Sequence, residues 1–300
     1  MNIAFGKKLG VFRGSLLLGL AVWLTGCVWI KERWNVPQNS DNTAAEQPKE
    51  TKQQVLPPSI HLAFGNPSNA TMDPANDENY LIIGDGSAFS YNNSRGTVNW
   101  ISWKTTRADL GDSRPRPDFR PNPRLPGNFV RIGYYDYSGS GYDRGHMVPS
   151  ADRFADARLN EETFMMTNIV PQTGALNQHP WEKLESYSRS QAWRGSDVYT
   201  IAGVYGEKGF LKRKVTIPTN CWKIVAILPQ GVTPDKIDQR TRIIAVDMSN
   251  IEGIENDRWE KYKTTIRNIE EKTGFDFFAS MPRGLQDEIE SRMGVRNPQR

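Results

Sequence analysis

Short apolar runs rich in β-branched and aromatic residues fill the middle of the 300-residue chain, and turn residues separate them. Such runs predict β-strands. In residues 97–105 (TVNWISWKT), Val98 and Trp100 alternate with residues of the opposite face. Further strands are predicted over 79–92, 127–135 (a shorter run), 162–172, 197–206, 214–229 and 242–250.

Apolar residues recur at helical spacing in three later segments, which are 179–193, 257–274 and 284–294. Pro180 suits the first turn of the first helix, and Gly274 and Gly294 suit the ends of the other two. Strands and helices mix without a regular alternation of strand, helix and strand. The pattern therefore predicts an α+β fold with a central, largely antiparallel sheet flanked by helices.

Residues 28–58 break this pattern, because they are poor in apolar side chains and rich in Gln, Asn, Thr, Lys, Glu and Pro. Such a stretch cannot bury enough apolar surface to offset the entropy of ordering it. We interpret residues 27–58 as a tether and residues 59–300 as one domain, since no repeat and no second linker follows.

The first 26 residues combine a basic start with a short apolar run, residues 16–24, that is about half the length of ~20 residues needed to span a bilayer. This favours a signal peptide. The run ends in Leu24-Thr25-Gly26-Cys27, a pattern typical of a bacterial lipobox, in which the Cys is acylated. We therefore predict an exported lipoprotein, held on a membrane through Cys27 and facing the periplasm or the exterior. The alternative is a short transmembrane anchor.

Removing that segment changes the charge balance. The whole chain has 38 Lys and Arg against 34 Asp and Glu, a net charge of +4. Residues 1–26 carry three basic residues and no acidic one, so the remainder carries a net charge of +1. Bulk charge is therefore no evidence for a nucleic-acid partner. The second cysteine, Cys221, lies in an apolar run and is predicted to be buried. The chain has only two cysteines, so with lipid on Cys27 a disulfide framework is excluded.

One candidate for chemistry is the string Asp143-Arg144-Gly145-His146 in a stretch punctuated by Gly and Pro. A histidine can accept a proton near neutral pH, and a guanidinium can hold a phosphate. His146 beside Arg144 in a loop could therefore activate water against a phosphodiester. The alternative is a surface turn in which Arg144 pairs with Asp143.

A second candidate is the start of the helix predicted over 179–193, where Asn177, Glu182 and Glu185 are close in sequence. Mg²⁺ prefers hard oxygen ligands and keeps several waters. Asn177 and Glu185 are eight residues apart, which suits one direct ligand and one group acting through water. The alternative is that Asn177 caps the helix and Glu185 is a solvated charge.

Taken together, DRGH (143–146) and TN-x-x-PQ-x-x-x-x-N-x-x-x-W-x-x-LE (167–185) resemble the non-specific DNA/RNA endonucleases of the ββα-metal, or His-Me finger, superfamily. The segments NWISWKT and RPDFRPNPRLP resemble it as well, so the similarity spans about residues 60–280. It implies a ββα-metal motif at the active site.

The resemblance implies a role for each matching residue. His146 corresponds to the general base, and Asn177 to the one direct protein ligand of Mg²⁺, with Mn²⁺ as an alternative ion. Glu185 corresponds to a carboxylate acting through water. Two arginines at the phosphate, Arg144 and Arg116, and a supporting residue, Asn168, complete the set.

The predicted function is metal-dependent hydrolysis of DNA and RNA to products with 5′-phosphates. Phosphate contacts carry no sequence information, so cleavage would be non-specific. Six arginines against three aspartates over 107–131 would supply local positive charge. Two alternatives are an inactive nucleic-acid-binding lipoprotein and a phosphodiesterase for a non-nucleic substrate. The sequence indicates neither an inhibitor protein nor an oligomeric state.

Overall fold

The computed structural model describes residues 56–112 and 116–294. The predicted signal segment and Cys27 lie outside these ranges, and so do Arg114 and most of the predicted tether. Within them, no helix combines the length and the apolar character that crossing a membrane requires.

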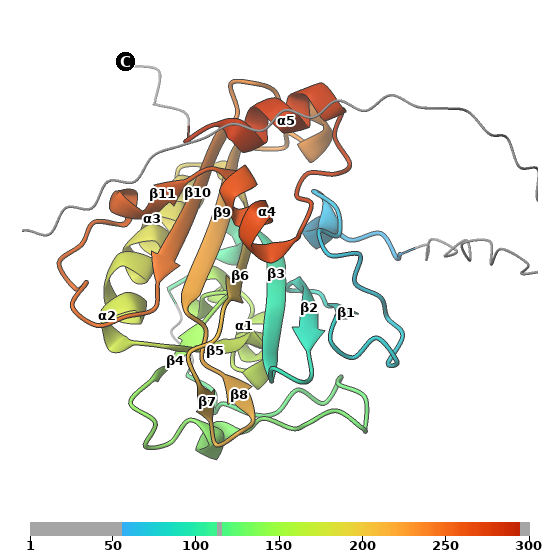
Figure 1. Cartoon of the computed structure of the whole chain (residues 1–300). Helices are drawn as coiled ribbons and strands as arrows, with labels where there is room; N and C mark the ends of the chain where they lie inside the picture. Colours follow the sequence, from blue (N-terminus) through green and yellow to red (C-terminus); the bar gives the residue numbers. More distant parts are fainter. Residues whose placement is uncertain (1–55, 113–115, 295–300) are drawn as a thin grey trace, which may run out of the picture. The chain divides into compact units, whose positions relative to one another are not determined.

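A seven-stranded antiparallel sheet is the centre of the fold, with strand order β1-β2-β3-β6-β9-β10-β11 (Figure 1). The strands are β1 (Tyr80–Ile83), β2 (Ala88–Asn92), β3 (Thr97–Thr105), β6 (Ser196–Tyr205), β9 (Asn220–Pro229), β10 (Arg242–Ser249) and β11 (Lys263–Thr264). Two further antiparallel pairs lie outside this sheet: β4 (Asp143–His146) with β5 (Ile169–Gln172), and β7 (Phe210–Leu211) with β8 (Val215–Thr216). The predicted α+β class is confirmed.

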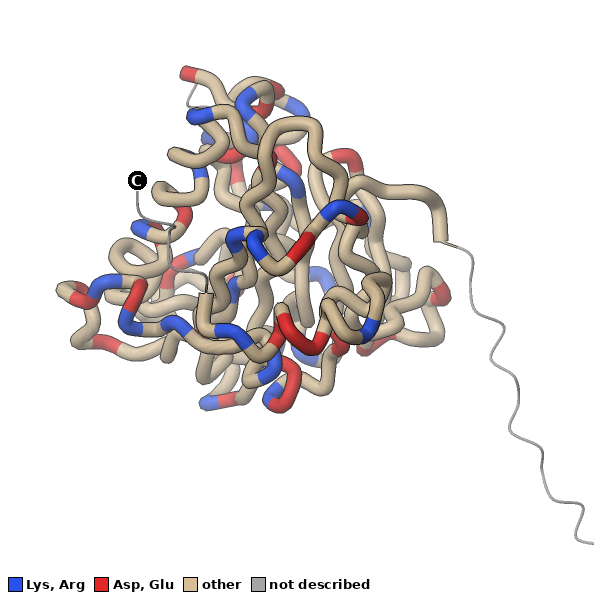
Figure 2. The backbone as a smooth tube through the Cα atoms, turned by 90° about the horizontal axis from the view of Figure 1, so that it is seen from above, with Lys and Arg blue, Asp and Glu red and all other residues tan. Residues whose placement is uncertain are grey.

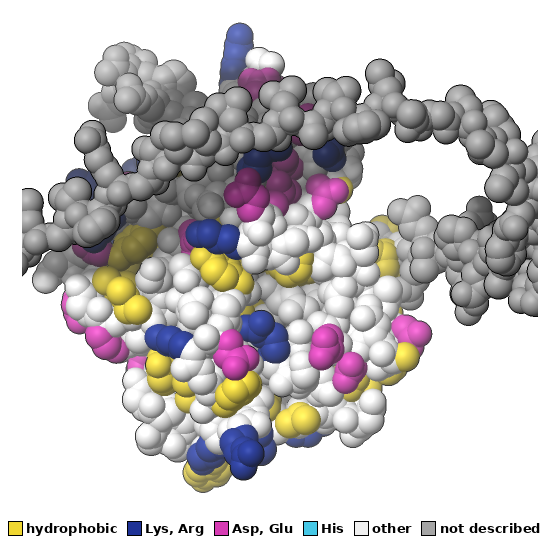
Figure 3. Space-filling view, viewed as in Figure 1, with side chains coloured by type: hydrophobic (Ala, Val, Ile, Leu, Met, Phe, Trp, Pro, Cys, Tyr) yellow, Lys and Arg dark blue, Asp and Glu magenta, His cyan; other side chains and the backbone are white. Residues whose placement is uncertain are grey.

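Charged residues of both signs are interspersed along the backbone seen from above (Figure 2). The space-filling view shows Lys and Arg side chains gathered at the lower end of the face in Figure 1, where the β7–β8 hairpin lies (Figure 3).

Both faces of the sheet are buried, which explains why its central strands are apolar without interruption. Along β9, Trp222, Ile224, Ala226 and Leu228 belong to one core cluster, and Cys221, Val225 and Ile227 to the other. Helices α4 (Ile266–Thr273) and α5 (Arg283–Ser291) contribute to the first cluster. Helix α3 (Glu182–Trp193) and the β4–β5 pair contribute to the second.

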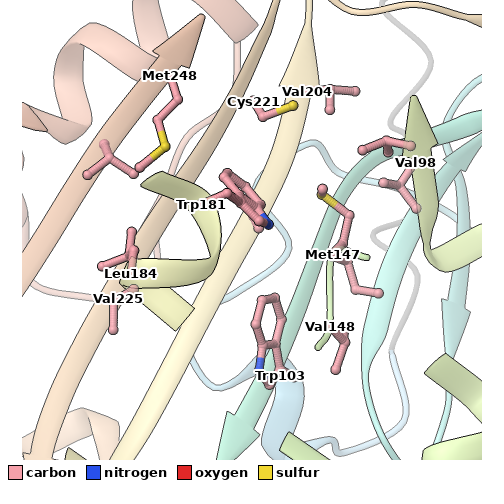
Figure 4. Packing of buried hydrophobic residues seen from close by; sticks show 14 of the residues in the cluster. Val98, Trp103, Met147, Val148, Trp181, Leu184, Val204, Cys221, Val225 and Met248 are labelled. Atoms are coloured by element: carbon pink, nitrogen blue, oxygen red, sulfur yellow. The ribbon is translucent and has the colours of Figure 1, made fainter. Parts of the chain in front are cut away.

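The second cluster is the layer between the sheet and the β4–β5 pair. Trp181, Trp103 and Met147 lie close together in it (Figure 4). Trp181 and Trp103 are at most 2% exposed, and Cys221 is fully buried, as predicted. Lys223 is on the same face of β9 as Cys221 and Val225, because side chains alternate along a strand.

Four strand predictions need correction. Residues 214–229 form two strands, β8 and β9, that belong to different sheets. Residues 79–92 form a hairpin, β1 and β2, whose turn is closed by Gly84 N–H donating to the Ser87 carbonyl. Residues 127–135 form no strand, since no partner strand accompanies them, and Tyr134–Asp136 is a 3₁₀ turn. In 162–172 only β5 is extended; helix α1 (Ala157–Thr163) comes before it, and the Asp156 side chain caps that helix.

The helix predicted over 179–193 begins earlier and is irregular. It runs through α2 (Gly174–Leu176), a π-helical turn (Asn177–Trp181) and α3 (Glu182–Trp193). Thr173 caps it, because its hydroxyl accepts from Leu176 N–H at 3.2 Å. Pro180 is therefore inside the π turn and not in the first turn of the helix. A π turn is wider than an α turn, which lets the helix accommodate a residue without an N–H.

The segment 257–274 also divides. Trp259–Tyr262 is a 3₁₀ turn, β11 pairs with β10, and only α4 (Ile266–Thr273) is α-helical. Thr265 caps α4 by accepting from Asn268 N–H at 3.1 Å, so a new helix begins there. Gly274 ends it at φ 74°, as predicted, and α5 (Arg283–Ser291) follows.

Candidate active site

The β4–β5 pair carries the candidate base. Asp143 pairs with Gln172, Gly145 with Val170 and His146 with Ile169. The DRGH string is thus a strand and not the loop expected from its glycines and prolines. Gly145 is needed for close approach, because a Cβ there would lie 2.0 Å from the Gln172 side chain. The α2–α3 helix follows β5 directly, so strand, strand and helix are contiguous in space.

His146 is enclosed by aromatic rings and its Nε2 has no hydrogen-bond partner among the described residues. The imidazole lies 5.0 Å from the Phe164 ring and 5.5 Å from the Phe119 ring, measured between centroids. Burial disfavours the charged imidazolium and lowers the pKa of His146 to about 4. A neutral imidazole with a free ring nitrogen can accept a proton.

Asn168 anchors the chain that leaves His146. Its amide donates to the carbonyls of Val148 (2.9 Å) and Thr163 (2.8 Å), and its Oδ1 accepts from Val148 N–H at 2.9 Å. All three bonds are buried. The side chain therefore holds the backbone two residues beyond His146, and it is too enclosed to contact substrate.

Asn177 does not cap the helix; it lies within it, with φ −60° and ψ −47°. Its Nδ2 donates to Asp143 Oδ2 at 2.9 Å, and Gln178 Nε2 donates to the same oxygen at 2.8 Å. Because the Asn177 amide nitrogen is bound to Asp143, its carbonyl oxygen is oriented away from that carboxylate. Asp143 thus joins the helix to β4.

Glu185 is buried and forms an ion pair with Lys223, whose Nζ is 3.2 Å from Glu185 Oε1. Burial raises the pKa of the carboxyl group, and the charges of Lys223 and Arg189 oppose this. Burial lowers the pKa of Lys223, which also lies 3.9 Å from the centre of the Trp181 ring. The pair is thus a fixed structural unit and not the solvated charge of the alternative interpretation.

A second buried pair lies next to it. Asp152 accepts from Trp103 Nε1 at 3.0 Å and from Thr105 Oγ1 at 3.1 Å, and its other oxygen is 3.3 Å from Arg189. Arg189 in turn approaches Glu182 at 3.5 Å. These contacts fix the first two turns of α3 against the sheet.

Arg144 and Arg116, the two arginines predicted at the phosphate, differ in their contacts and in their exposure. The Arg144 guanidinium stacks on Tyr134 at 3.8 Å from the ring centre and donates to the Tyr134 carbonyl at 2.8 Å. Its Nε is buried without a partner in the described part of the chain. Arg116 is exposed, whereas Arg120, four residues further along the same loop, is paired with Glu161 at 3.0 Å.

An open cleft of about 430 Å³ brings the main residues together. His146, Asn177 and Glu185 line it, along with Glu182 and Arg189. A second cleft of about 440 Å³ contains Arg116 and Phe119, and the two clefts share Ser150 and Phe154 in their walls. Oxygen ligands, a neutral imidazole and guanidinium groups thus line two adjoining clefts, which suits hydrolysis of a phosphodiester.

Sequence reasoning missed the residues that hold this site in place. Lys223 is a charged residue in the middle of the apolar run CWKIVAIL, and that interruption was the available signal. Asp143 and Asp152 gave no comparable signal, since acidic residues beside turns are common. Their partners, Asn177 and Arg189, are more than thirty residues away in sequence.

The comparison with known proteins agrees with this chemistry. Residues 65–284 match the family described as DNA/RNA non-specific endonuclease. The chain is 43% identical over 237 residues to a Nostoc sp. protein named Nuclease, a match covering 78% of this chain and 86% of that protein. It is 31% identical over 234 residues to Nuclease C1 of Cunninghamella echinulata, covering 72% and 86%.

A solved structure shares the fold. A chain in the crystal structure of the EndoG/EndoGI complex matches with a TM-score of 0.62 at 21% identity, over 77% of this chain and 96% of that chain.

Proposed function

The chain belongs to the DNA/RNA non-specific endonuclease family and is an endonuclease; from this premise we propose that it hydrolyses DNA and RNA with one divalent metal ion and leaves 5′-phosphate ends. The observation that carries the proposal is the buried, unpartnered Nε2 of His146 in the cleft that Asn177 and Glu185 also line. Native proteins leave few buried polar atoms unpaired, and functional sites are one reason for an exception.

Side chains of this protein transfer the proton and bind the phosphate. His146 accepts a proton from water, and the hydroxide attacks phosphorus in line with the 3′ oxygen. The P–O3′ bond breaks and the leaving 3′ oxygen takes up a proton from solvent, so one product carries a 5′-phosphate and the other a 3′-hydroxyl. The proton held by His146 returns to solvent. Arg144 and Arg116 bind phosphate oxygens and stabilise the charge that develops on them.

The residues present fit a divalent ion. Asn177 offers its carbonyl oxygen because Asp143 holds the amide nitrogen, and Glu185 lines the same cleft. Such hard oxygen ligands suit Mg²⁺ or Mn²⁺. When bound by Asn177, with Glu185 acting through water, the ion would supply Lewis-acid stabilisation of the phosphoryl and leaving oxygens.

The direct test is cleavage of supercoiled plasmid and of RNA by the purified protein with Mg²⁺, with Mn²⁺ and with EDTA. We expect cleavage of both substrates with either metal and none with EDTA. His146→Ala should lower the rate about 10²–10⁴-fold, because general-base catalysis contributes that much. Its circular dichroism spectrum should match the wild type, and His179→Ala, on the half-buried side chain beyond Asn177, provides a histidine control.

Several outcomes would contradict the proposal. A fully active His146→Ala protein would exclude the assigned base. Binding of nucleic acid without cleavage would favour the inactive binding protein. Cleavage of a small diester without cleavage of either polymer would favour a different phosphodiesterase.

We also propose that the nuclease is exported and membrane-anchored through lipid on Cys27. The support is the basic start, the apolar run and the Leu24-Thr25-Gly26-Cys27 pattern. In a bacterial host, the wild type should be found in the membrane fraction and incorporate labelled palmitate. Cys27→Ala should abolish the labelling; a Cys27→Ala protein that is still labelled would exclude lipid at this position.

A further inference from the structure

Three of the six arginines in the stretch 107–131 bind carboxylates or carbonyl groups of the protein itself. Arg120 pairs with Glu161 at 3.0 Å and Arg124 approaches Glu162 at 3.8 Å. Arg131 donates to three backbone carbonyls of its own loop. The stretch therefore offers a nucleic-acid backbone less positive charge than its number of arginines suggests. Other basic residues near the cleft would have to contribute.

The β7–β8 hairpin offers such a source. Its tip reads Leu211-Lys212-Arg213-Lys214, and all three basic residues are exposed. Lys214 is paired with Asp136 at 3.1 Å, but no ion pair of Lys212 or Arg213 is found in the described residues. The tip contributes to the Lys and Arg side chains gathered at the lower end of the molecule (Figure 3).

The backbone of the hairpin tip has an unfavourable conformation. Lys212 and Arg213 have φ values of 44° and 58°, and Lys214 N–H donates to the Leu211 carbonyl at 2.9 Å. Positive φ at both central residues of a hairpin turn favours Asn and Gly. Two long basic side chains at these positions make the turn strained, and strained residues concentrate at functional sites.

The hairpin is rigidly joined to the candidate active site. Leu211, Val215 and Ile217 belong to one core cluster with Ile169 of β5, the residue that pairs with His146. Lys212 Nζ donates to the Tyr135 carbonyl. The preceding residue, Tyr134, accepts from Arg144 and stacks on it.

The same region exposes aromatic surface. Tyr135 is 76% exposed, Phe210 50% and Tyr134 47%. Exposed aromatics among basic residues are typical of surfaces that bind nucleic-acid strands, because phosphates bind the cations and bases stack on the rings.

We infer that Lys212 and Arg213, together with Tyr135, form a subsite for the nucleic-acid strand that continues beyond the scissile phosphate. Lys212 and Arg213 contact backbone phosphates, and Tyr135 stacks on a base. The subsite selects polymers over small diesters, since only a polymer reaches from Arg144 to the hairpin tip. This inference rests on the proposed nuclease function and specifies its substrate class.

The test uses the variant Lys212→Asn/Arg213→Gly in the full chain. It removes both charges and supplies the residues that the turn prefers, so we expect a melting temperature at least equal to the wild type. For RNA and denatured DNA, we expect KM to rise on the order of tenfold at 150 mM NaCl with kcat unchanged. The slope of log kcat/KM against log [NaCl] should become shallower by about 1.4–1.8, because each phosphate contact contributes about 0.7–0.9.

Two controls isolate the effect. Lys236→Ala/Arg240→Ala removes two exposed charges from the loop after β9, at the opposite end of that strand from the hairpin, and should leave KM and the salt slope at wild-type values. Bis(p-nitrophenyl) phosphate, a small diester, should be cleaved equally by all three proteins. Tyr135→Ala should raise KM for denatured DNA more than for duplex DNA.

Different outcomes would overturn the proposed nuclease function and the proposed subsite. A wild type that cleaves no nucleic acid would overturn the proposed function and this subsite with it. An active wild type whose hairpin variant keeps the wild-type KM and salt slope would overturn the subsite alone. An equal loss on the polymer and on the small diester would show that the hairpin acts on the catalytic residues, which also overturns it.

Discussion

Burial shifts the pKa values of His146 and Glu185, which both line the cleft, in opposite directions. It lowers the pKa of His146 to about 4 and raises that of Glu185, because each charged form loses hydration. Lys223 compensates Glu185 through an ion pair at 3.2 Å, whereas among the residues that the structure describes only burial shifts the pKa of His146. The imidazole is thus kept neutral, and the carboxylate is held by its cationic partner.

The pH dependence of cleavage follows from the pKa of His146. A general base acts in its unprotonated form, and the lowered pKa keeps that form populated well below the ordinary value of about 6.5. We therefore expect kcat/KM to stay near its maximum at pH 6 and to fall only as the pH approaches 4. Initial rates on plasmid over pH 4–9, at saturating metal, measure this; an acidic limb centred at 6.5 or above would contradict it.

At the scale of elements, the site depends on the β4–β5 pair and on the irregular α2–α3 helix. Only Thr173 separates the end of β5 from the start of that helix. β5 ends at Gln172, and Thr173 caps the helix that carries Asn177 and Glu185. Trp181, in the π turn, donates from its indole to the His146 carbonyl at 3.3 Å. The helix and β4 are therefore fixed to each other at two points, the second being the bond between Asp143 and Asn177.

Gly145→Ala tests the closeness of β4 to β5. The new Cβ would lie 2.0 Å from the Gln172 side chain, which is fully buried. Overpacking of this kind costs about 1–3 kcal/mol, so we expect a lower free energy of unfolding in urea and a large loss of cleavage.

Gly174→Ala is the matched control for that variant, because it is on the same unit and its nearest side-chain atom would be 3.5 Å away. It should unfold at the wild-type urea concentration or higher, since Ala favours helices over Gly. Equal stability of the two variants would show that the strands can separate freely at Gly145.

At the scale of the molecule, the sheet separates the nuclease cleft from the first core cluster, over which α4 and α5 lie (Figure 1). That far side holds an acidic cluster of its own. Carboxylate oxygens of Glu270, Asp276 and Glu290 lie within 4.8 Å of one another. Burial, and then the charge of Glu270, raises the pKa of Glu290 to about 7.

Stability should therefore depend on pH through Glu290. Its folded-state pKa exceeds the ordinary 4.5, so its contribution to stability is fully present below pH 4.5 and is lost as the pH rises through about 7. Glu290→Gln should raise the free energy of unfolding at pH 8 by about 1–3 kcal/mol. At pH 5 the gain should be smaller.

Urea unfolding at both pH values measures this, and exposed Glu271→Gln on the same helix as Glu270 is the control. A Glu290→Gln protein that is less stable than the wild type at pH 8 would contradict the prediction. Because the cluster is on the far side of the sheet, nuclease activity should be unchanged.

The sequence by itself determined most strands and the segments that supply the site. Apolar alternation and helical spacing report burial against the nearest neighbours along the chain, so they located β3, β6 and β10 well, and β9 as part of a longer predicted strand. They failed where tertiary contacts compete with local pattern. Residues 263–264 lie in a segment with helical spacing, but they pair with the edge of β10 and form β11. The segment 127–135 pairs with no strand among the described residues.

Only the tertiary structure decided how the polar residues of the site are used. Asn177 is held by Asp143 instead of capping a helix, and Glu185 is paired with Lys223 from a strand 38 residues away. Several arginines of the 107–131 stretch are bound by their own protein, whereas Lys212 and Arg213 form no ion pair within the described residues. Pairing between distant charged side chains depends on which elements meet in space, and it leaves no periodic pattern in the sequence from which it could be predicted.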